Sequence, residues 1–262
     1  MELLDLEYHS VNVSKDDFVI VIENNTVIVN KDRTFLKAND VVGDVQFLFK
    51  YDGVKYFLGK KVDDSDNYLR MNVMEIRNML SYEIAMMVSV AMQLARFYDS
   101  NVFCGKCGSK MQVADNERAM VCKCGNRAYP KVAPATITAI IDRKNDCILM
   151  TRGIHMKDPK SYGLVAGFVE AGETFEECVY REIKEEVNLK VKNLKYFANQ
   201  PWGFGDNIMI AYTAELDGSN EFVVQESELT KVWWQKREDI EPVERPLSVG
   251  HKMVQAFRKG EL

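Results

Sequence analysis

The chain lacks the long apolar runs and the basic beginning that mark membrane and secreted proteins. No run of apolar residues approaches the roughly 20 that a membrane-spanning helix needs. The acidic start, MELLDLEYHSVNVSKDD, has no basic segment followed by an apolar core. We therefore expect a protein of the cytoplasm that has neither a signal peptide nor a membrane partner.

Positive charge is also scarce. Lysine and arginine total 34 against 39 aspartates and glutamates, a formal net charge of −5. Such a chain has no global positive field to attract nucleic acid or an anionic membrane. An anionic substrate would therefore need local help from a metal ion or from backbone dipoles. Internal repeats and low-complexity tracts are absent too.

The chain divides into three parts. Residues 1–100 are expected to form a small α+β domain, with β-branched runs at 17–22 and 26–30, and a hairpin of 45–50 and 54–58 around Asp52-Gly53. Ser81 would cap a helix that follows it. Residues 101–132 are rich in cysteine. Residues 133–262 combine strands, one acidic helix and a final amphipathic helix near 249–257.

Four cysteines within the second part indicate a metal site. Cys104 and Cys107 form one close pair, Cys122 and Cys124 form another, and a glycine follows the second cysteine of each pair. Two such turns can close around one zinc ion, and four thiolates leave no open position for water. We predict a structural Zn²⁺, one per chain. A disulfide framework is disfavoured in the cytoplasm.

The third part contains an unusual acidic helix. Phe175, Val179, Ile183 and Val187 recur every four residues, which predicts a helix from about Thr174 to Val187. With about 100° of rotation per residue, Glu186 falls inside the apolar arc, Glu182 falls at its edge and Glu185 lies farther round.

This placement argues against a merely solvated acidic face. Glu182 and Glu186 are like charges one turn apart, and their partial burial is unfavourable unless the charge is paired. A divalent cation removes both objections, and oxygen ligands favour Mg²⁺ or Mn²⁺. Glycines before the helix permit a tight loop, so that the helix N-terminus can face phosphate.

The segment from Gly167 to Leu189 resembles the Nudix box, G-x5-E-x7-R-E-U-x-E-E-x-G-U with U aliphatic. Every defined position matches except that Asn188 replaces a glycine, and Asn is the next-best residue for a left-handed helix end. The resemblance implies an α+β fold, with a Nudix α/β/α sandwich around a mixed sheet at 133–262. The zinc ribbon and the small N-terminal α+β domain would precede it.

Two features resemble the NADH pyrophosphatase subfamily of Nudix hydrolases. One is the cysteine ribbon before the box, followed by RAYP at 127–130. The other is NQPWGFGDNIM at 199–209, which resembles the signature S-Q-P-W-P-F-P-x-S. Both later prolines are glycines here, and both serines are asparagines. The resemblance covers about residues 75–262. The competing interpretation of the second segment is a turn-rich loop with a buried tryptophan.

The resemblance also implies the site residues. The catalytic candidates are Glu173, Arg181, Glu182, Glu185 and Glu186, with the general base left open between the last two. The divalent cation would be held by Glu182, Glu186, the carbonyl of Ala166 and Glu228, for which Glu226 is the competing choice. Substrate contacts would come from Tyr129, Phe168, Gln200, Pro201, Trp202, Gly203, Phe204, Gly205, Asp206, Asn207 and Gly250. Phe168 could instead be a core residue, and Gly250 stands where relatives carry alanine.

The activity implied is metal-dependent hydrolysis of the diphosphate bond of NAD(H), giving AMP and NMN(H). The substrate would be a small dinucleotide, and the resemblance implies a homodimer. One alternative keeps the chemistry and changes the substrate to ADP-ribose, a dinucleoside polyphosphate or the NAD-capped 5′ end of an RNA. The outside alternative is a non-catalytic module that senses nucleotides.

Overall fold

The computed structural model describes residues 4–8, 11–24, 26–62, 67–72, 75–76 and 81–262. These residues divide into two compact units. The first comprises residues 1–131 together with Gly203–Asp206, and the second comprises residues 132–202 and 207–262. Among the described residues, no helix combines the length and the apolar character needed to cross a bilayer.

A mixed sheet forms much of the first unit. Its elements are β1 (Leu4–Asp5), β2 (Phe18–Glu23), β3 (Thr26–Asn30), β4 (Leu36–Lys37), the 3-10 helix η1 (Ala38–Asp40), β5 (Gln46–Tyr51), β6 (Val54–Gly59) and β7 (Tyr68–Asn72). The strand order is β1-β5-β6-β2-β3-β7, with β4 paired to β2. Asp52 and Gly53 both have positive φ, as a two-residue hairpin turn requires, so the predicted hairpin is confirmed.

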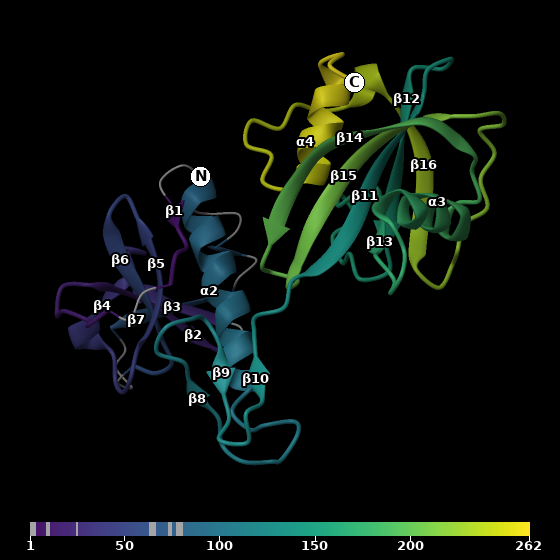
Figure 1. Cartoon of the computed structure of the whole chain (residues 1–262). Helices are drawn as coiled ribbons and strands as arrows, with labels where there is room; N and C mark the ends of the chain where they lie inside the picture. The colour runs from purple at the N-terminus through teal and green to yellow at the C-terminus, as the bar shows by residue number, and fades with distance from the viewer. Residues whose placement is uncertain (1–3, 9–10, 25, 63–66, 73–74, 77–80) are drawn as a thin grey trace. The chain divides into compact units, whose positions relative to one another are not determined.

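Helix α2 (Tyr82–Ser100) packs on one face of this sheet (Figure 1). Ser81 caps it by accepting a hydrogen bond from the Ile84 N–H, as predicted. Ile20 and Leu48 of the sheet share a buried apolar cluster with α2. Alternate strand residues, such as Val19 and Val21, pack in a separate cluster on the other face.

The cysteine-rich segment belongs to the same compact unit. Its strands are β8 (Gln112–Val113), β9 (Met120–Val121) and β10 (Arg127–Ala128). The apolar cluster that contains the buried residues of α2 also includes Cys104, Met111, Met120 and Cys122. The ribbon and the preceding residues therefore share one core.

The second unit is a mixed sheet between two helices. Its strands are β11 (Ala133–Asp142), β12 (Cys147–Gly153), β13 (Val165–Phe168), β14 (Val191–Trp202), β15 (Asn207–Leu216) and β16 (Leu229–Lys236), followed by η2 (Arg237–Asp239). The order is β14-β15-β11-β12-β16, and β13 pairs with β11. β11 and β15 run parallel, whereas the other pairs are antiparallel.

Helices α3 (Phe175–Glu186) and α4 (Val249–Arg258) cover opposite faces of this sheet (Figure 1). Ile140 of β11 packs in one cluster with Val179 of α3. Its neighbour Ile141 packs in the other, with Phe257 of α4. Successive strand residues point to opposite faces, so β11 contributes to both cores. The predicted α/β/α arrangement and final helix are confirmed.

Candidate active site

Helix α3 begins and ends where the sequence predicts. Thr174 is its N-cap, and Thr174 and Glu177 form a reciprocal capping box. Val187 is its C-cap, and Asn188 follows with φ of +52°. Asparagine tolerates this left-handed conformation better than most residues, which explains why it can replace glycine here.

The helix buries two carboxylates on its apolar face. Glu186 is 3% exposed and Glu182 is 8% exposed, and the buried residues Val179 and Ile183 share the same face. Glu185 is exposed. This distribution confirms the predicted helix face. Phe175 differs from the expectation because it is exposed, and the buried face begins one turn later.

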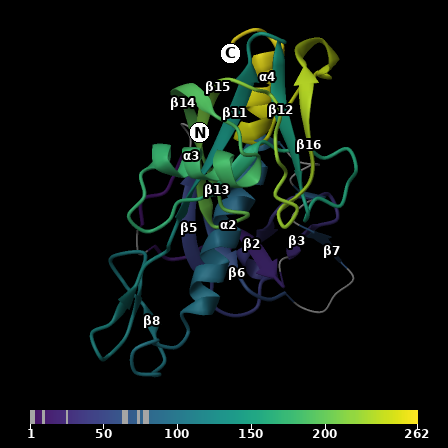
Figure 2. The same ribbon diagram turned by 90° about the vertical axis from the view of Figure 1, so that its right-hand side faces the viewer.

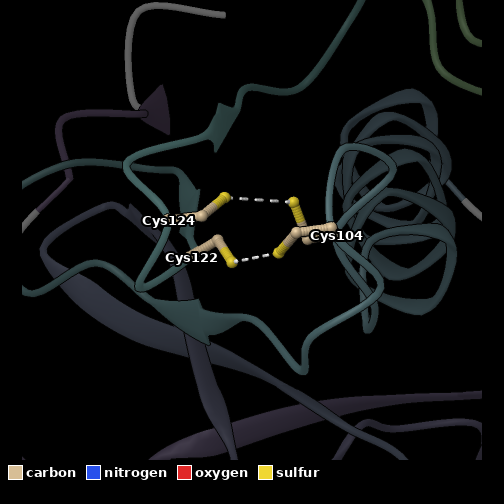
Figure 3. A group of neighbouring side chains, drawn as sticks. Cys104, Cys122 and Cys124 are labelled. Atoms are coloured by element: carbon tan, nitrogen blue, oxygen red, sulfur yellow. Dashed lines mark hydrogen bonds between the residues drawn. The ribbon is translucent and has the colours of Figure 1, made fainter.

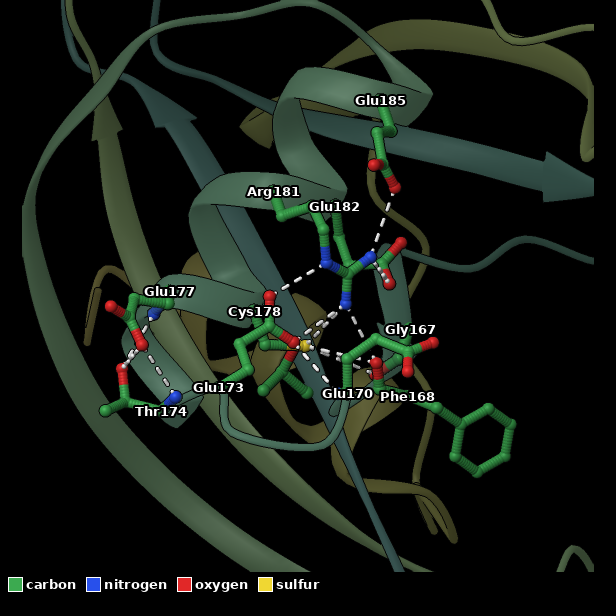
Figure 4. Close-up of polar contacts among 11 residues, drawn as sticks. Gly167, Phe168, Glu170, Glu173, Thr174, Glu177, Cys178, Arg181, Glu182 and Glu185 are labelled. Carbon is green, nitrogen blue, oxygen red and sulfur yellow. Dashed lines mark hydrogen bonds and ion pairs between the residues drawn. The ribbon is translucent and has the colours of Figure 1, made fainter.

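Arg181 forms hydrogen bonds with acidic residues of α3 and of the loop before it (Figure 4). Its guanidinium donates to both carboxylate oxygens of Glu173, at 2.8 and 2.9 Å, and to the Phe168 carbonyl at 2.9 Å. It also donates to Glu182 Oε1 at 2.6 Å and Glu185 Oε2 at 3.1 Å. Arg181 lowers the pKa of Glu173 to about 2 through these hydrogen bonds. The loop before α3 is thereby tied to the helix.

Glu186 has no such cationic partner among the described residues. Its Oε1 accepts a 3.4 Å hydrogen bond from the Ala166 N–H, and its buried Oε2 has no hydrogen-bond partner. Burial, with smaller contributions from Glu182 and Glu228, raises the pKa of Glu186 to about 8. Burial also raises the pKa of Glu182, although Arg181 opposes the effect. A buried acceptor without a partner is unfavourable, and a cation would satisfy it.

Strand β13 approaches these carboxylates closely. β13 and α3 lie side by side (Figure 2). A Cβ added to Gly167 would overlap the carboxylate of Glu182, so a larger residue at this position would displace that carboxylate. The neighbouring backbone N–H of Ala166 reaches Glu186. Ala166 therefore lies beside the two glutamates.

The segment after β15 brings a further carboxylate. The N–H of Gln225 donates to the Glu186 carbonyl, and that of Val223 donates to the Val187 carbonyl, both at 3.0 Å. These bonds fix the segment to the end of α3. The charge of Glu228 contributes to the raised pKa of both Glu182 and Glu186, so Glu228 lies near enough to act on both carboxylates.

The carboxylates suit a hard divalent cation by their chemistry and by the unsatisfied oxygen of Glu186. Their ligand atoms lie farther apart than those of the cysteines. In the part of the chain that the structure describes, the four cysteines are the one group of three or more His, Cys, Asp or Glu residues whose ligand atoms lie within 4.8 Å of one another. One oxygen of Glu182 is instead held by Arg181.

The four cysteines form the predicted zinc site (Figure 3). The Sγ atoms of Cys104 and Cys124 are 3.8 Å apart, and those of Cys107 and Cys122 are 3.5 Å apart. Tetrahedral zinc with Zn–S bonds of about 2.3 Å requires sulfurs about 3.8 Å apart. The following glycines, 108 and 125, both have positive φ. Hydrogen bonds from the Ser109 backbone and hydroxyl are the main causes that lower the pKa of Cys107 to about 6.

The loop from Gln200 to Asn207 is the β14–β15 hairpin turn with its flanks. Gln200 is buried, donates to the Leu247 carbonyl at 2.9 Å and accepts from the Val249 N–H at 2.5 Å. Its amide thus joins β14 to the start of α4, a structural role that the sequence did not indicate. Asn207 is also buried and donates to the Met209 sulfur.

The remaining substrate candidates differ in exposure. Phe168 is 56% exposed beside the carboxylates and extends away from Arg181 in Figure 4, which disfavours a core role. Tyr129 is 50% exposed and donates to Glu117 at 3.4 Å. Gly250 is buried, and a Cβ added there would lie 2.9 Å from Ile137 Cδ1, so an alanine would require the end of the Ile137 side chain to shift.

The rest of the loop has mixed exposure. Pro201 and Gly205 are exposed, Trp202 is half-buried, and Phe204 packs against the core of the first unit. Gly203 and Asp206 contact Arg96 of α2. The sequence pattern indicates no role for Arg96, because one arginine within a helix carries no local signal of a partner far along the chain.

Comparisons with known proteins agree with these features. A family model described as "NUDIX domain" matches residues 131–255. A second, described as "NADH pyrophosphatase zinc ribbon domain", matches residues 99–129. The first therefore covers β11 to α4, including the carboxylate helix, and the second contains all four cysteines.

Curated relatives carry the name "NAD-capped RNA hydrolase NudC". The protein of Salmonella typhi is 42% identical over 164 residues, which is 62% of each chain. That of Salmonella agona is 41% identical over the same length. The matched region thus spans 62% of these relatives' length. A solved NUDIX hydrolase from Nitrosomonas europaea is 19% identical, with a TM-score of 0.48, covering 61% of this chain and 92% of that one.

Proposed function

We propose that the chain hydrolyses the diphosphate bond of NAD(H) to AMP and NMN(H), because residues 131–255 match a NUDIX domain and residues 99–129 match an NADH pyrophosphatase zinc ribbon domain. The observation that carries the proposal is the buried Glu186, whose Oε2 has no partner, beside the buried Glu182. An intact carboxylate set disfavours the non-catalytic alternative.

Glu182, Glu186, Glu228 and the carbonyl of Ala166 would hold Mg²⁺ or Mn²⁺. When bound, such an ion withdraws charge from diphosphate oxygens and lowers the pKa of water. Arg181 keeps Glu173 ionised and fixes the loop before the helix. Two residues are candidates for the general base. Glu185 is exposed and paired with Arg181, and Glu186 is buried.

The substrate would be recognised by aromatic side chains. Phe168 beside the carboxylates and Tyr129 of the ribbon both present exposed rings. Trp202 is half-buried in the hairpin loop. Flat apolar rings suit a nucleobase or a nicotinamide. We also propose a homodimer and a cytoplasmic location, on the resemblance and the composition.

A second candidate substrate is the NAD-capped 5′ end of RNA. It is favoured by the name of the Salmonella relatives, which are 41–42% identical over the matched region. A net charge of −5 disfavours extensive contact with an RNA body but not recognition of its 5′ end.

Incubation with NADH and Mg²⁺ or Mn²⁺, followed by product identification, tests the proposal. We expect AMP and NMNH in equal amounts and no turnover after chelation. Parallel assays with ADP-ribose and with NAD-capped RNA rank the alternatives. An enzyme that cleaves ADP-ribose but leaves NADH and NAD⁺ intact would contradict the proposed substrate.

A further inference from the structure

The tip of the β14–β15 hairpin is held by helix α2. Arg96 of α2 donates from Nε to Asp206 Oδ2 at 2.8 Å and from Nη2 to Asp206 Oδ1 at 2.5 Å. The same Nη2 donates to the Gly203 carbonyl. The Arg96 side chain thus binds Gly203 and Asp206, the first and last residues of the four-residue tip. A bidentate pair fixes orientation as well as distance.

The tip is fitted to the surface of α2 by close packing as well. A Cβ added to Gly203 would overlap the backbone carbonyl and the hydroxyl of Ser89. Ser89 and Arg96 are seven residues apart, so they lie two turns apart on one helix face. Phe204 packs against the apolar cluster of the first unit. The steric overlap with Ser89 therefore requires glycine at position 203.

Asp206 adopts a conformation that needs support. Its φ is +56°, in the left-handed region that aspartate tolerates but does not prefer. The next residue along, Asn207, pairs with Trp202 across the hairpin. Arg96 therefore holds Gly203 and Asp206, the two residues that adjoin this pair in the chain.

We propose that Arg96 is a positioning residue for substrate recognition, and that α2 serves to hold the hairpin tip in its binding conformation. This inference rests on the proposed function, in which Trp202 of the Gln200–Asn207 loop recognises the dinucleotide. Asp206 then acts through Arg96 instead of touching substrate. Without the ion pair, the tip samples other conformations, and binding must order it again.

Three variants test this: Arg96→Met, Asp206→Asn and their combination. Asp206→Asn keeps size and left-handed tolerance while it removes the charge. Lys60→Met is the matched control, because it removes a different ion pair with α2. Lys60 Nζ lies 2.5 Å from Oδ1 of Asp99, which is a residue of α2. We expect Arg96→Met to raise KM for NADH about five- to tenfold, with kcat changed less than about twofold. Lys60→Met should change neither, and the double variant should resemble the single variants.

Amide hydrogen exchange gives a readout independent of activity. In Arg96→Met, the amides of residues 203–206 should exchange at least about tenfold faster than in the unmodified protein or in Lys60→Met. An unchanged KM and unchanged exchange in both single variants would overturn the inference. Additive effects of the two substitutions on KM would also overturn it, because Asp206 would then contact substrate itself. Absence of NADH hydrolysis by the unmodified protein overturns the proposed function instead, and exchange alone then decides whether Arg96 holds the tip.

Discussion

Glu186→Gln is the substitution whose effect follows most directly from the structure. It keeps the size of the side chain and its hydrogen bond from the Ala166 N–H, and it removes the negative charge. If Glu186 helps to hold a cation that stabilises developing charge, turnover should fall at least about a hundredfold. That loss corresponds to about 2.7 kcal/mol in the barrier, at about 1.4 kcal/mol per tenfold.

Although Glu186→Gln should reduce turnover, it should increase the stability of the metal-free protein at high pH. The pKa of Glu186 is raised from 4.5 to about 8, so folded protein retains a proton that unfolded protein has lost between these values. The free energy of unfolding of metal-free protein should therefore decrease as pH rises from about 4.5 to 8. The expected decrease is a few kcal/mol, because one pKa unit corresponds to about 1.4 kcal/mol. Glu186→Gln removes this decrease.

Steady-state kinetics with NADH and denaturant unfolding of chelator-treated protein at pH 5 and pH 8.5 measure both effects. Glu176→Gln is the matched control, because Glu176 is an exposed residue of the same helix that accepts from the Tyr212 hydroxyl. It should keep both the activity and the pH dependence. A Glu186→Gln enzyme with most of its activity would refute the proposed role of Glu186 in holding the cation. Identical pH dependence in both variants would refute the raised pKa.

Three further substitutions test other parts of the molecule. Gly167→Ala should abolish turnover, because its Cβ would displace the carboxylate of Glu182; wild-type kinetics would show that the strand yields. Cys107→Ser should reduce zinc from about one equivalent to near zero by elemental analysis and destabilise the first unit, and retention of a full equivalent would contradict the four-thiolate site. Gln200→Leu should lower the free energy of unfolding by about 2–4 kcal/mol, since it leaves the Val249 N–H and a carbonyl unpaired; an unchanged melting curve would argue against this structural role.

Local patterns predicted the elements whose causes are local. The four-residue apolar period predicts the bounds of α3 to within a residue, and Asp52-Gly53 predicts the hairpin of β5 and β6. The same period placed Glu186 among apolar side chains, which is where the structure has it. Spacing alone was also sufficient for the zinc site, because paired cysteines next to glycines have few other uses.

Contacts between distant segments could not be predicted in this way. Gln200 belongs to a stretch that resembles a substrate-binding signature, yet its amide bonds residues 247 and 249. Arg96 and Asp206 are 110 positions apart, and neither has a local pattern that names the other. Hydrophobic periodicity and capping describe neighbours within a few residues, so they carry no information on such pairs.

The first compact unit is discontinuous along the chain, since it ends at Lys131 and is completed only by Gly203–Asp206. No single cut in the polypeptide separates the two units without taking these four residues from one of them. A fragment that stops at residue 131 would present Ser89 and Arg96 without the tip that covers them. During synthesis, the amino-terminal unit emerges first but must wait for much of the second unit to be translated before it is complete. The contacts of Arg96 with the tip join residues 110 positions apart, and contacts of such long range are the kind that slow folding.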